Sequence, residues 1–159
     1  QGKLRGPLHG IPVLLKDNIA AKGMHATAGA WALRDWQPDQ DAVLVKNLRD
    51  AGALILGKTN LSEWANYMDP NMPSGFSALG GQTRNPYGAY EVWGSSSGSA
   101  VAASANFAAA TIGTETQGSI IRPADINGVV AIKTSKGRVS TDNIIPLVDW
   151  MDVPGPMAR

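Results

Sequence analysis

The stretch from Gly94 to Pro123 decides how the rest of this chain is interpreted. It reads Gly94-Ser95-Ser96-Ser97-Gly98-Ser99, continues through an Ala-rich segment, and ends with Gly113-Thr114-Glu115-Thr116-Gln117-Gly118-Ser119-Ile120-Ile121-Arg122-Pro123. Two Gly/Ser turns therefore flank one small-residue segment, Ala100 to Ala110, which we expect to be helical. Such a turn at the start of a helix directs backbone N–H groups toward whatever lies in front of it. Apolar segments border both turns too closely for a flexible linker, which is the alternative interpretation.

The second turn has the local chemistry of a nucleophile. Gly118 lies next to Ser119, so the turn leaves backbone donors uncovered on both sides of a hydroxyl. A hydroxyl among uncovered N–H groups is typical of a nucleophile beside an oxyanion hole.

Composition limits the class of protein. The 159 residues make at most one ordinary domain, with 43% hydrophobic but only 6% aromatic residues. The formal net charge is +1 without a Lys/Arg block, which argues against a partner that is nucleic acid or a membrane surface. Cysteine is absent, which excludes disulfides and thiolate catalysis. The segment 100–112 is too short to span a membrane and no signal peptide is visible, so we expect a soluble protein and favour the cytoplasm.

Apolar runs alternate with helical patterns along the chain, which favours an α/β fold with parallel strand pairing. Asp39 or Asp41 is expected to cap the first helix and Gly52 to end it. Segment 69–90 is predicted to be a long ordered loop, and the Pro-rich remainder after 133 another loop. The expected strands are 11–15, 53–56, 111–112 and 129–133, all short and the first two buried, and the expected helices are 39–52, 61–67 and 100–110.

The segment from Gly52 to Thr59 matches the phosphate-binding pattern G-x-x-x-x-G-K-[ST]. That pattern requires the four intervening residues to form a loop whose N–H groups face phosphate. Here they are Ala-Leu-Ile-Leu, a strand core whose amides belong to a sheet. We therefore predict that this segment binds no nucleotide.

Gly94 to Gly98 contains G-x-S-x-G, the pattern of the α/β-hydrolase nucleophile. That mechanism needs a histidine downstream of the serine, and the only histidines, His9 and His25, lie upstream. They also lack the spacing of metal ligands, so we interpret both as loop residues and expect no metal.

Without a suitable histidine, a lysine is the best candidate for the base. Burial lowers the pKa of a lysine because the ammonium loses water, so a neutral amine can accept a serine proton. Lys16 follows an apolar run that ends at a strand terminus, and we expect neighbouring Asp17 to oppose the loss of charge. Lys58 and Lys133 also end apolar runs, so spacing alone does not choose among the three.

Several segments together resemble the amidase signature family, most closely its peptide amidase branch. They are Gly6-Pro7-Leu8-His9-Gly10-Ile11-Pro12-Val13, Lys16-Asp17-Asn18, Gly57-Lys58-Thr59-Asn60-Leu61-Ser62-Glu63-Trp64-Ala65-Asn66, Gly81-Gln82-Thr83-Arg84-Asn85-Pro86-Tyr87 and the two Gly/Ser turns. The resemblance covers essentially the whole chain.

This resemblance implies a Ser–cis-Ser–Lys triad with Lys16 as base, Ser95 as bridging residue and Ser119 as nucleophile. It places the oxyanion hole on the backbone amides of Thr116, Gln117, Gly118 and Ser119. It also implies an α/β/α fold with a mixed sheet, and hydrolysis of a linear carboxamide in a small molecule or peptide through an acyl-enzyme without a cofactor. Residues 1–159 would be a partial domain, truncated at both ends.

Some positions depart from the family pattern. Gln117 and Trp93 replace smaller residues, and Asp125 and Thr134 replace small residues or proline. Arg122 lies one residue later than the arginine that in many members pairs with the acidic residue matching Glu115. These departures affect the geometry expected for the oxyanion turn, but none removes a member of the triad.

Two other functions are compatible with the same residues. The A-type component of an aminoacyl-tRNA amidotransferase shares the triad but requires tRNA together with a partner protein, and Leu61–Asn66 and Glu115 favour the amidase instead. An amidase-like fragment that only binds is the second alternative, because an incomplete sheet would expose an apolar edge.

Overall fold

A mixed five-stranded sheet forms the centre of the computed structural model, which describes residues 2–159. Its strands follow the order β2-β1-β5-β7-β6, with β1 parallel to β2 and β5, and β7 antiparallel to β5 and β6. The predicted α/β class with parallel pairing is therefore confirmed for the first three strands, and the mixed sheet implied by the resemblance is present. The strands are β1 (Pro12–Lys16), β2 (Leu54–Thr59), β5 (Ala110–Glu115), β6 (Val130–Ala131) and β7 (Val153–Ala158).

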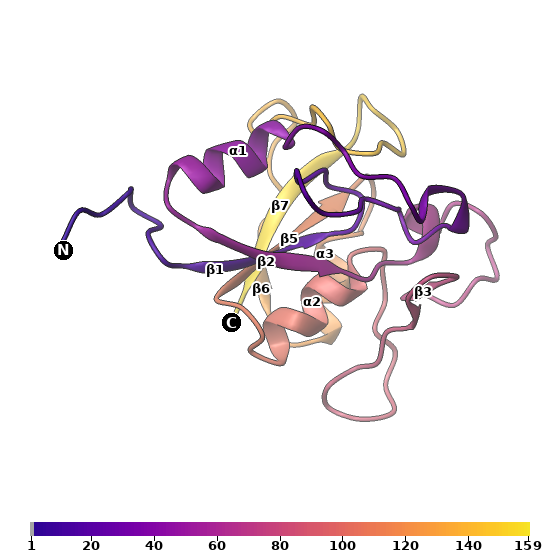
Figure 1. The fold of residues 1–159 in the computed structure, drawn as a ribbon. Coiled ribbons are helices and arrows are strands. Elements are labelled where there is room, and N and C mark those ends of the chain that lie inside the picture. Colours follow the sequence, from indigo (N-terminus) through magenta and orange to yellow (C-terminus); the bar gives the residue numbers. More distant parts are fainter. Residues whose placement is uncertain (1) are drawn as a thin grey trace.

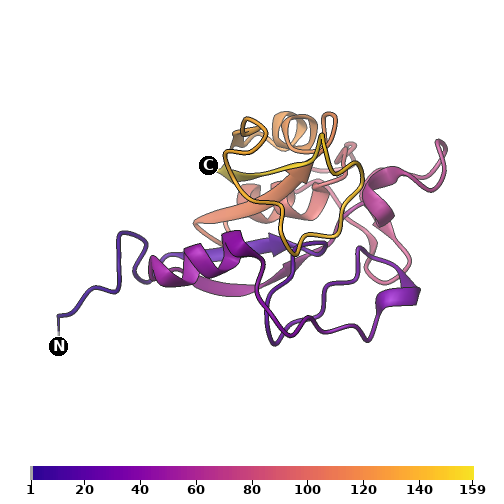
Figure 2. The same cartoon turned by 90° about the horizontal axis from the view of Figure 1, so that it is seen from above.

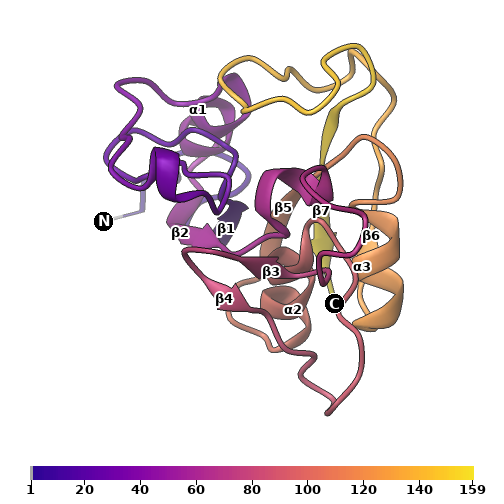
Figure 3. The ribbon, with the colours of Figure 1, turned by 90° about the vertical axis from the view of Figure 1, so that its right-hand side faces the viewer.

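Helices cover both faces of this sheet. Figure 1 shows α1 (Val43–Asp50) on one side and α2 (Ser97–Ser104) on the other, while the first described residues extend away from the body in Figures 1 and 2. Figure 3 shows α3 (Ile121–Ile126) on the same side as α2. The connections hold two 3-10 helices, η1 (Trp31–Leu33) and η2 (Glu63–Asn66), and a hairpin of β3 (Phe76–Ser77) and β4 (Gly81–Gln82).

Successive residues of β1 serve opposite faces of the sheet, as the pleat of a strand requires. Val13 and Leu15 belong to the apolar core that also contains Leu44 and Val45 of α1. The side chain of Lys16 is therefore directed to the α2 side, where the first Gly/Ser turn lies. This alternation delivers a buried cation to the start of α2.

Helix α2 packs tightly on the sheet because its residues are small. Seven of its eight residues are buried. Ser99 donates its hydroxyl to the carbonyl of Ile112 (3.0 Å) and shares a 2.8 Å hydrogen bond with Thr59, while Thr111 donates to the carbonyl of Ser99 (2.9 Å). These hydroxyl contacts fix the helix against β2 and β5, and the rigid helix in turn fixes the turn that precedes it.

The first helix is shorter than predicted and is not capped by an aspartate. Helix α1 starts after Ala42, which makes no side-chain capping bond. Asp41 instead accepts the N–H of Lys22 (2.8 Å) and forms an ion pair with Arg49 (3.0 Å). The capping prediction was wrong because a tertiary contact takes the carboxylate.

Strand β2 lies at an edge of the sheet, so the prediction of a fully buried second strand was wrong. Leu54 and Leu56 are 50% and 53% exposed. The strand continues through Gly57, Lys58 and Thr59. The lysine of the apparent phosphate-binding pattern is thus strand backbone rather than loop, which agrees with the rejection of that motif.

The predicted C-terminal loop contains a strand that the sequence pattern concealed. Pro154 and Pro156 lie inside β7, and their carbonyls accept bonds from the Thr134 hydroxyl (2.8 Å) and the Ile132 N–H (3.1 Å). Nitrogen and carbonyl of one strand residue face the same neighbour, so the missing N–H groups face away from β5. The long ladder between β5 and β7 therefore loses no donor to proline.

Other boundaries differ from the prediction for local reasons. The Ala-rich helix ends at Ser104, and Asn106 then adopts a φ of 63° that no helix continues through. Trp64, Ala65 and Asn66 have φ values of 46°, 57° and 70°, so the predicted helix at 61–67 is only a short, irregular 3-10 element. The expected strand at 129–133 is reduced to β6.

The long loop between residues 69 and 90 is ordered, as predicted, by one side chain. The amide of Asn60 donates to the carbonyls of Gly75 and Gly81 (3.4 and 3.0 Å) and to Thr83 (3.0 Å), while its oxygen accepts from Ser77 (2.7 Å). Among residues 2–159, none of the helices is long and apolar enough to cross a membrane.

Replacing Gly98 with alanine should destabilise the protein by about 1–3 kcal/mol, the usual cost of overpacking a core. An added Cβ would overlap the backbone oxygen of Asn60 and lie 2.7 Å from its backbone nitrogen, neither of which can move without displacing the loop anchor. Gly57→Ala is the matched control, because its Cβ would meet only Leu14, at 3.7 Å. Urea unfolding of both variants measures the difference, and equal stabilities would contradict this account of the packing.

Candidate active site

Lys16 is a fully buried amine in contact with a serine. Its side chain has 0% exposure, and Nζ donates to Ser95 Oγ (2.7 Å) and to the Thr114 carbonyl (3.2 Å). Burial lowers the pKa of Lys16 to about 7, against the opposing charges of Asp152 and then Glu115. The amine is therefore about half neutral near pH 7, which a proton acceptor requires.

The structure separates the three lysines that spacing left equivalent. Lys58 forms an ion pair with Asp17 (3.1 Å) and donates to the His25 carbonyl (3.0 Å). Lys133 forms an ion pair with Glu115 (2.9 Å), and only Lys16 of the three has a hydrogen bond to a serine hydroxyl. Asp17 is occupied by Lys58 and is not among the charges that raise the pKa of Lys16, so that expectation was wrong. Adjacent strand residues point to opposite faces, which explains the error.

The first Gly/Ser turn brings Ser95 to Lys16 and its neighbour to Ser119. The peptide bond between Gly94 and Ser95 is cis, and Ser95 is fully buried. The N–H of Ser96 donates to the carbonyl of Ser119 (3.1 Å), and the Ser96 hydroxyl donates to the carbonyl of Thr114 (2.9 Å). Backbone contacts thus join the two turns that are separated by α2 in sequence.

The Ser119 side chain lies at the edge of this arrangement. It is 8% exposed, and its hydroxyl makes no hydrogen bond to another residue within 2–159. The structure therefore contains the Lys16–Ser95 contact, but the hydroxyl of Ser119 would have to turn toward Ser95 to complete a relay. Catalytic hydrogen bonds often form fully only when substrate is bound.

A single carboxylate organises the turn that carries Ser119. Glu115 accepts the N–H groups of Gly118 (2.7 Å), Ile120 (2.7 Å) and Ile121 (3.0 Å). Burial raises the pKa of Glu115, but the Ile121 and Ile120 N–H groups, Lys133 and the Gly118 N–H outweigh burial, so the pKa lies below its usual value. The charged carboxylate is therefore part of the turn.

This arrangement divides the backbone donors predicted for an oxyanion hole. The N–H of Gly118 is directed to Glu115, so Gly118 could serve an oxyanion only by sharing or losing that bond. The N–H groups of Gln117 and Ser119 donate to no acceptor in the described part of the chain. They are the donors left available by the turn, with Thr116 directly before them.

The departures from the family pattern have local structural consequences. Lys133 pairs with Glu115, the partner that an arginine has in many members, and it also donates to the Thr116 carbonyl (3.1 Å). The guanidinium of Arg122 instead lies 3.8 Å from the ring centre of Trp93, a cation–π contact. The shifted arginine and the large residue before Gly94 therefore compensate each other.

A narrow cavity of about 30 Å³, roughly the space of one water, lies beside Ser95. Sequence reasoning did not identify three of its lining residues, Asn18, Trp64 and Asp152, because no motif marks them. The cavity is lined mainly by apolar side chains. Within residues 2–159, no three His, Asp or Glu side chains gather as they would around a metal ion.

The family model for amidases matches residues 1–159. This chain belongs to the amidase family. The crystal structure of native peptide amidase from Stenotrophomonas maltophilia is 61% identical to it, with a TM-score of 0.94 over 98% of this chain. An amidase family protein from Bacillus anthracis is 50% identical, with a TM-score of 0.96 over 99% of the chain.

A third relative comes from another branch of the amidase family. The A-type component of the glutamyl-tRNA(Gln) amidotransferase from Moorella thermoacetica is 41% identical over 100% of this chain. This amidase chain spans 32% of the length of each of these three proteins. The similarity to the peptide amidase confirms the predicted branch at the level of sequence and fold.

Removing Lys58 should affect stability rather than nucleotide binding. Lys58→Met would leave Asp17 without its ion pair at a largely buried position, which should cost about 1–3 kcal/mol in the free energy of unfolding. Calorimetric titration of the unaltered protein with ATP should give no saturable heat. A saturable heat that disappears in Lys58→Met would instead restore the phosphate-binding interpretation.

Proposed function

We propose that the whole protein hydrolyses a linear amide through an acyl-enzyme on Ser119. Lys16 is the base and Ser95 relays the proton between Lys16 and Ser119. The observation that carries the proposal is the 2.7 Å contact between a fully buried lysine and a fully buried serine, next to the turn that holds a second serine.

In the first half of the reaction, the Ser119 oxygen attacks the amide carbonyl. Its proton passes to Ser95 while the Ser95 proton passes to Lys16, which becomes an ammonium. The carbon–nitrogen bond then breaks as the proton returns through Ser95 to the leaving nitrogen. The products at this stage are an amine or ammonia and an ester on Ser119.

In the second half, water attacks the ester and gives its proton to the same relay. The bond from carbon to the Ser119 oxygen breaks, the serine regains its proton, and a carboxylic acid leaves. The relay needs a lysine that is neutral before each attack, and burial supports this by lowering the pKa of Lys16 to about 7.

The amides of Thr116, Gln117, Gly118 and Ser119 remain the proposed oxyanion hole, with Gln117 and Ser119 as its most available donors. Each oxyanion donor typically contributes about a hundred- to a thousandfold in rate. The Glu115 carboxylate supports this role by holding the turn from its other side.

We propose a peptide or small-molecule amide as the substrate. The Stenotrophomonas peptide amidase was also solved with the competitive inhibitor chymostatin, and its 61% identity supports this class. The apolar lining of the cavity beside Ser95 is compatible with an apolar group next to the scissile bond.

The amidotransferase alternative is supported by the 41% identity to the Moorella thermoacetica protein. It predicts that activity depends on tRNA and on partner proteins, whereas an amidase acts alone on a free amide. A binding-only protein would react with no serine-directed reagent.

Ser119→Ala should abolish amide hydrolysis and labelling by a fluorophosphonate, because the attacking oxygen is lost. The variant is made in the protein as its gene encodes it, and its thermal unfolding should change little, since only one partly accessible hydroxyl is removed. Labelling that persists in Ser119→Ala would move the nucleophile to Ser95 or Ser96.

The pH dependence of kcat/KM tests Lys16 directly. The rate should rise with pH through about 7 as the amine loses its proton, because only the neutral form accepts a proton. Lys16→Ala should lose about 10²–10⁴-fold in kcat and flatten this limb. Lys16→Arg should be nearly as slow, since a guanidinium keeps its proton. An Arg variant with most of the activity would show that position 16 supplies only charge.

A further inference from the structure

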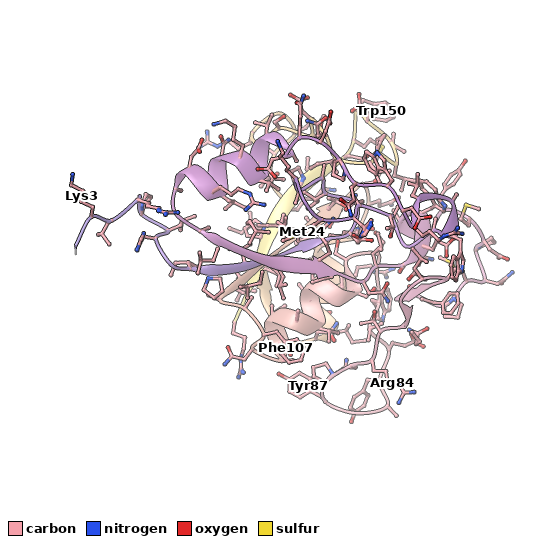
Figure 4. All side chains as sticks on the ribbon, viewed as in Figure 1. Lys3, Met24, Arg84, Tyr87, Phe107 and Trp150 are labelled. Atoms are coloured by element: carbon pink, nitrogen blue, oxygen red, sulfur yellow. The ribbon has the colours of Figure 1, made fainter. Side chains whose placement is uncertain are left out.

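Asp152 is a buried carboxylate that no sequence motif indicates. It is 8% exposed and directly precedes β7. Its oxygens accept the N–H groups of Leu147 (2.7 Å) and Val148 (3.0 and 3.1 Å). The loop from 147 to 152 therefore closes on this one side chain, while Trp150 at its tip is exposed and points outward (Figure 4).

The same carboxylate also reaches the site. It accepts the hydroxyl of Thr116, the residue that opens the turn carrying Ser119. Lys133 donates to the carbonyl of Thr116 (3.1 Å), so this residue is held at its side chain by an anion and at its backbone by a cation. Glu115 holds the following residues of the turn, which makes Thr116 the connection between two anchoring carboxylates.

We propose, as a refinement that rests on the proposed function, that Asp152 is a positioning residue for amide hydrolysis. It acts in two ways: it fixes Thr116 through the hydroxyl, and it places a negative charge near the Lys16–Ser95 pair. Neither role requires contact with substrate.

The electrostatic part follows from the proton relay. When Lys16 accepts a proton it becomes a buried ammonium, which an anion nearby stabilises. Asp152 and Glu115 are the charged groups that oppose the burial of Lys16, from the loop before β7 and from β5. Asp17, the third carboxylate near this strand end, is occupied by Lys58. Without Asp152, the amine would be a weaker base.

Two variants separate the two roles. Asp152→Asn removes the charge, and we expect the acidic limb of kcat/KM to move to lower pH because the neutral amine is then favoured. Thr116→Val removes only the hydroxyl contact, and we expect a fall in kcat of about ten- to a hundredfold from misplacement, with the limb unmoved. Thr116→Ser should restore most of the rate, since it keeps the hydroxyl. Asp142→Asn is the matched control, an exposed carboxylate of the same connection before β7.

The outcomes distinguish this inference from the proposed function. If the unaltered protein neither hydrolyses an amide nor labels at Ser119, the proposed function fails. If it does both, but Asp152→Asn leaves the limb unmoved or Asp142→Asn moves it equally, the electrostatic role is wrong. If Asp152→Asn does not fold, the hydroxyl contact decides: Thr116→Val with unchanged kcat overturns the positioning role.

Discussion

The burial of one lysine is the constraint on which the rest of this structure depends. A buried ammonium without partners would be costly, and Lys16 avoids this by a lowered pKa and by contacts to Ser95 and the Thr114 carbonyl. These contacts require the end of β1, the start of α2 and strand β5 to meet at one point. The small residues of α2 make that approach possible, because a larger side chain would hold the helix away from the sheet.

A second constraint is the shape of the turn after β5. A short stretch of backbone must present Ser119 and leave donors free, yet a buried turn leaves N–H groups that need partners. Glu115 resolves the conflict by accepting three of them on one side. The donors of Gln117 and Ser119 remain available because the carboxylate has already fixed the path of the chain around them.

The elements that could be predicted from the sequence were those with a local signal. An apolar run followed by lysine indicated β1 and a buried amine, and Gly/Ser turns around small residues indicated α2 and its neighbours. Strand β7 was missed because Pro154 and Pro156 usually exclude a central strand, and only the direction of their carbonyls explains the exception. The choice among three lysines likewise depended on partners distant in sequence, which no spacing rule contains.

The two anchoring carboxylates explain why the site tolerates its departures from the family pattern. An arginine one residue later cannot reach Glu115 as in other members, yet the turn keeps its charge balance because Lys133 takes that place. Arg122 is then free to stack on Trp93, which directly precedes the Gly94–Ser95 pair. Substitutions on both sides of the site therefore change together, and the geometry at Lys16, Ser95 and Ser119 is maintained by the charges around the turn rather than by the identity of any one partner.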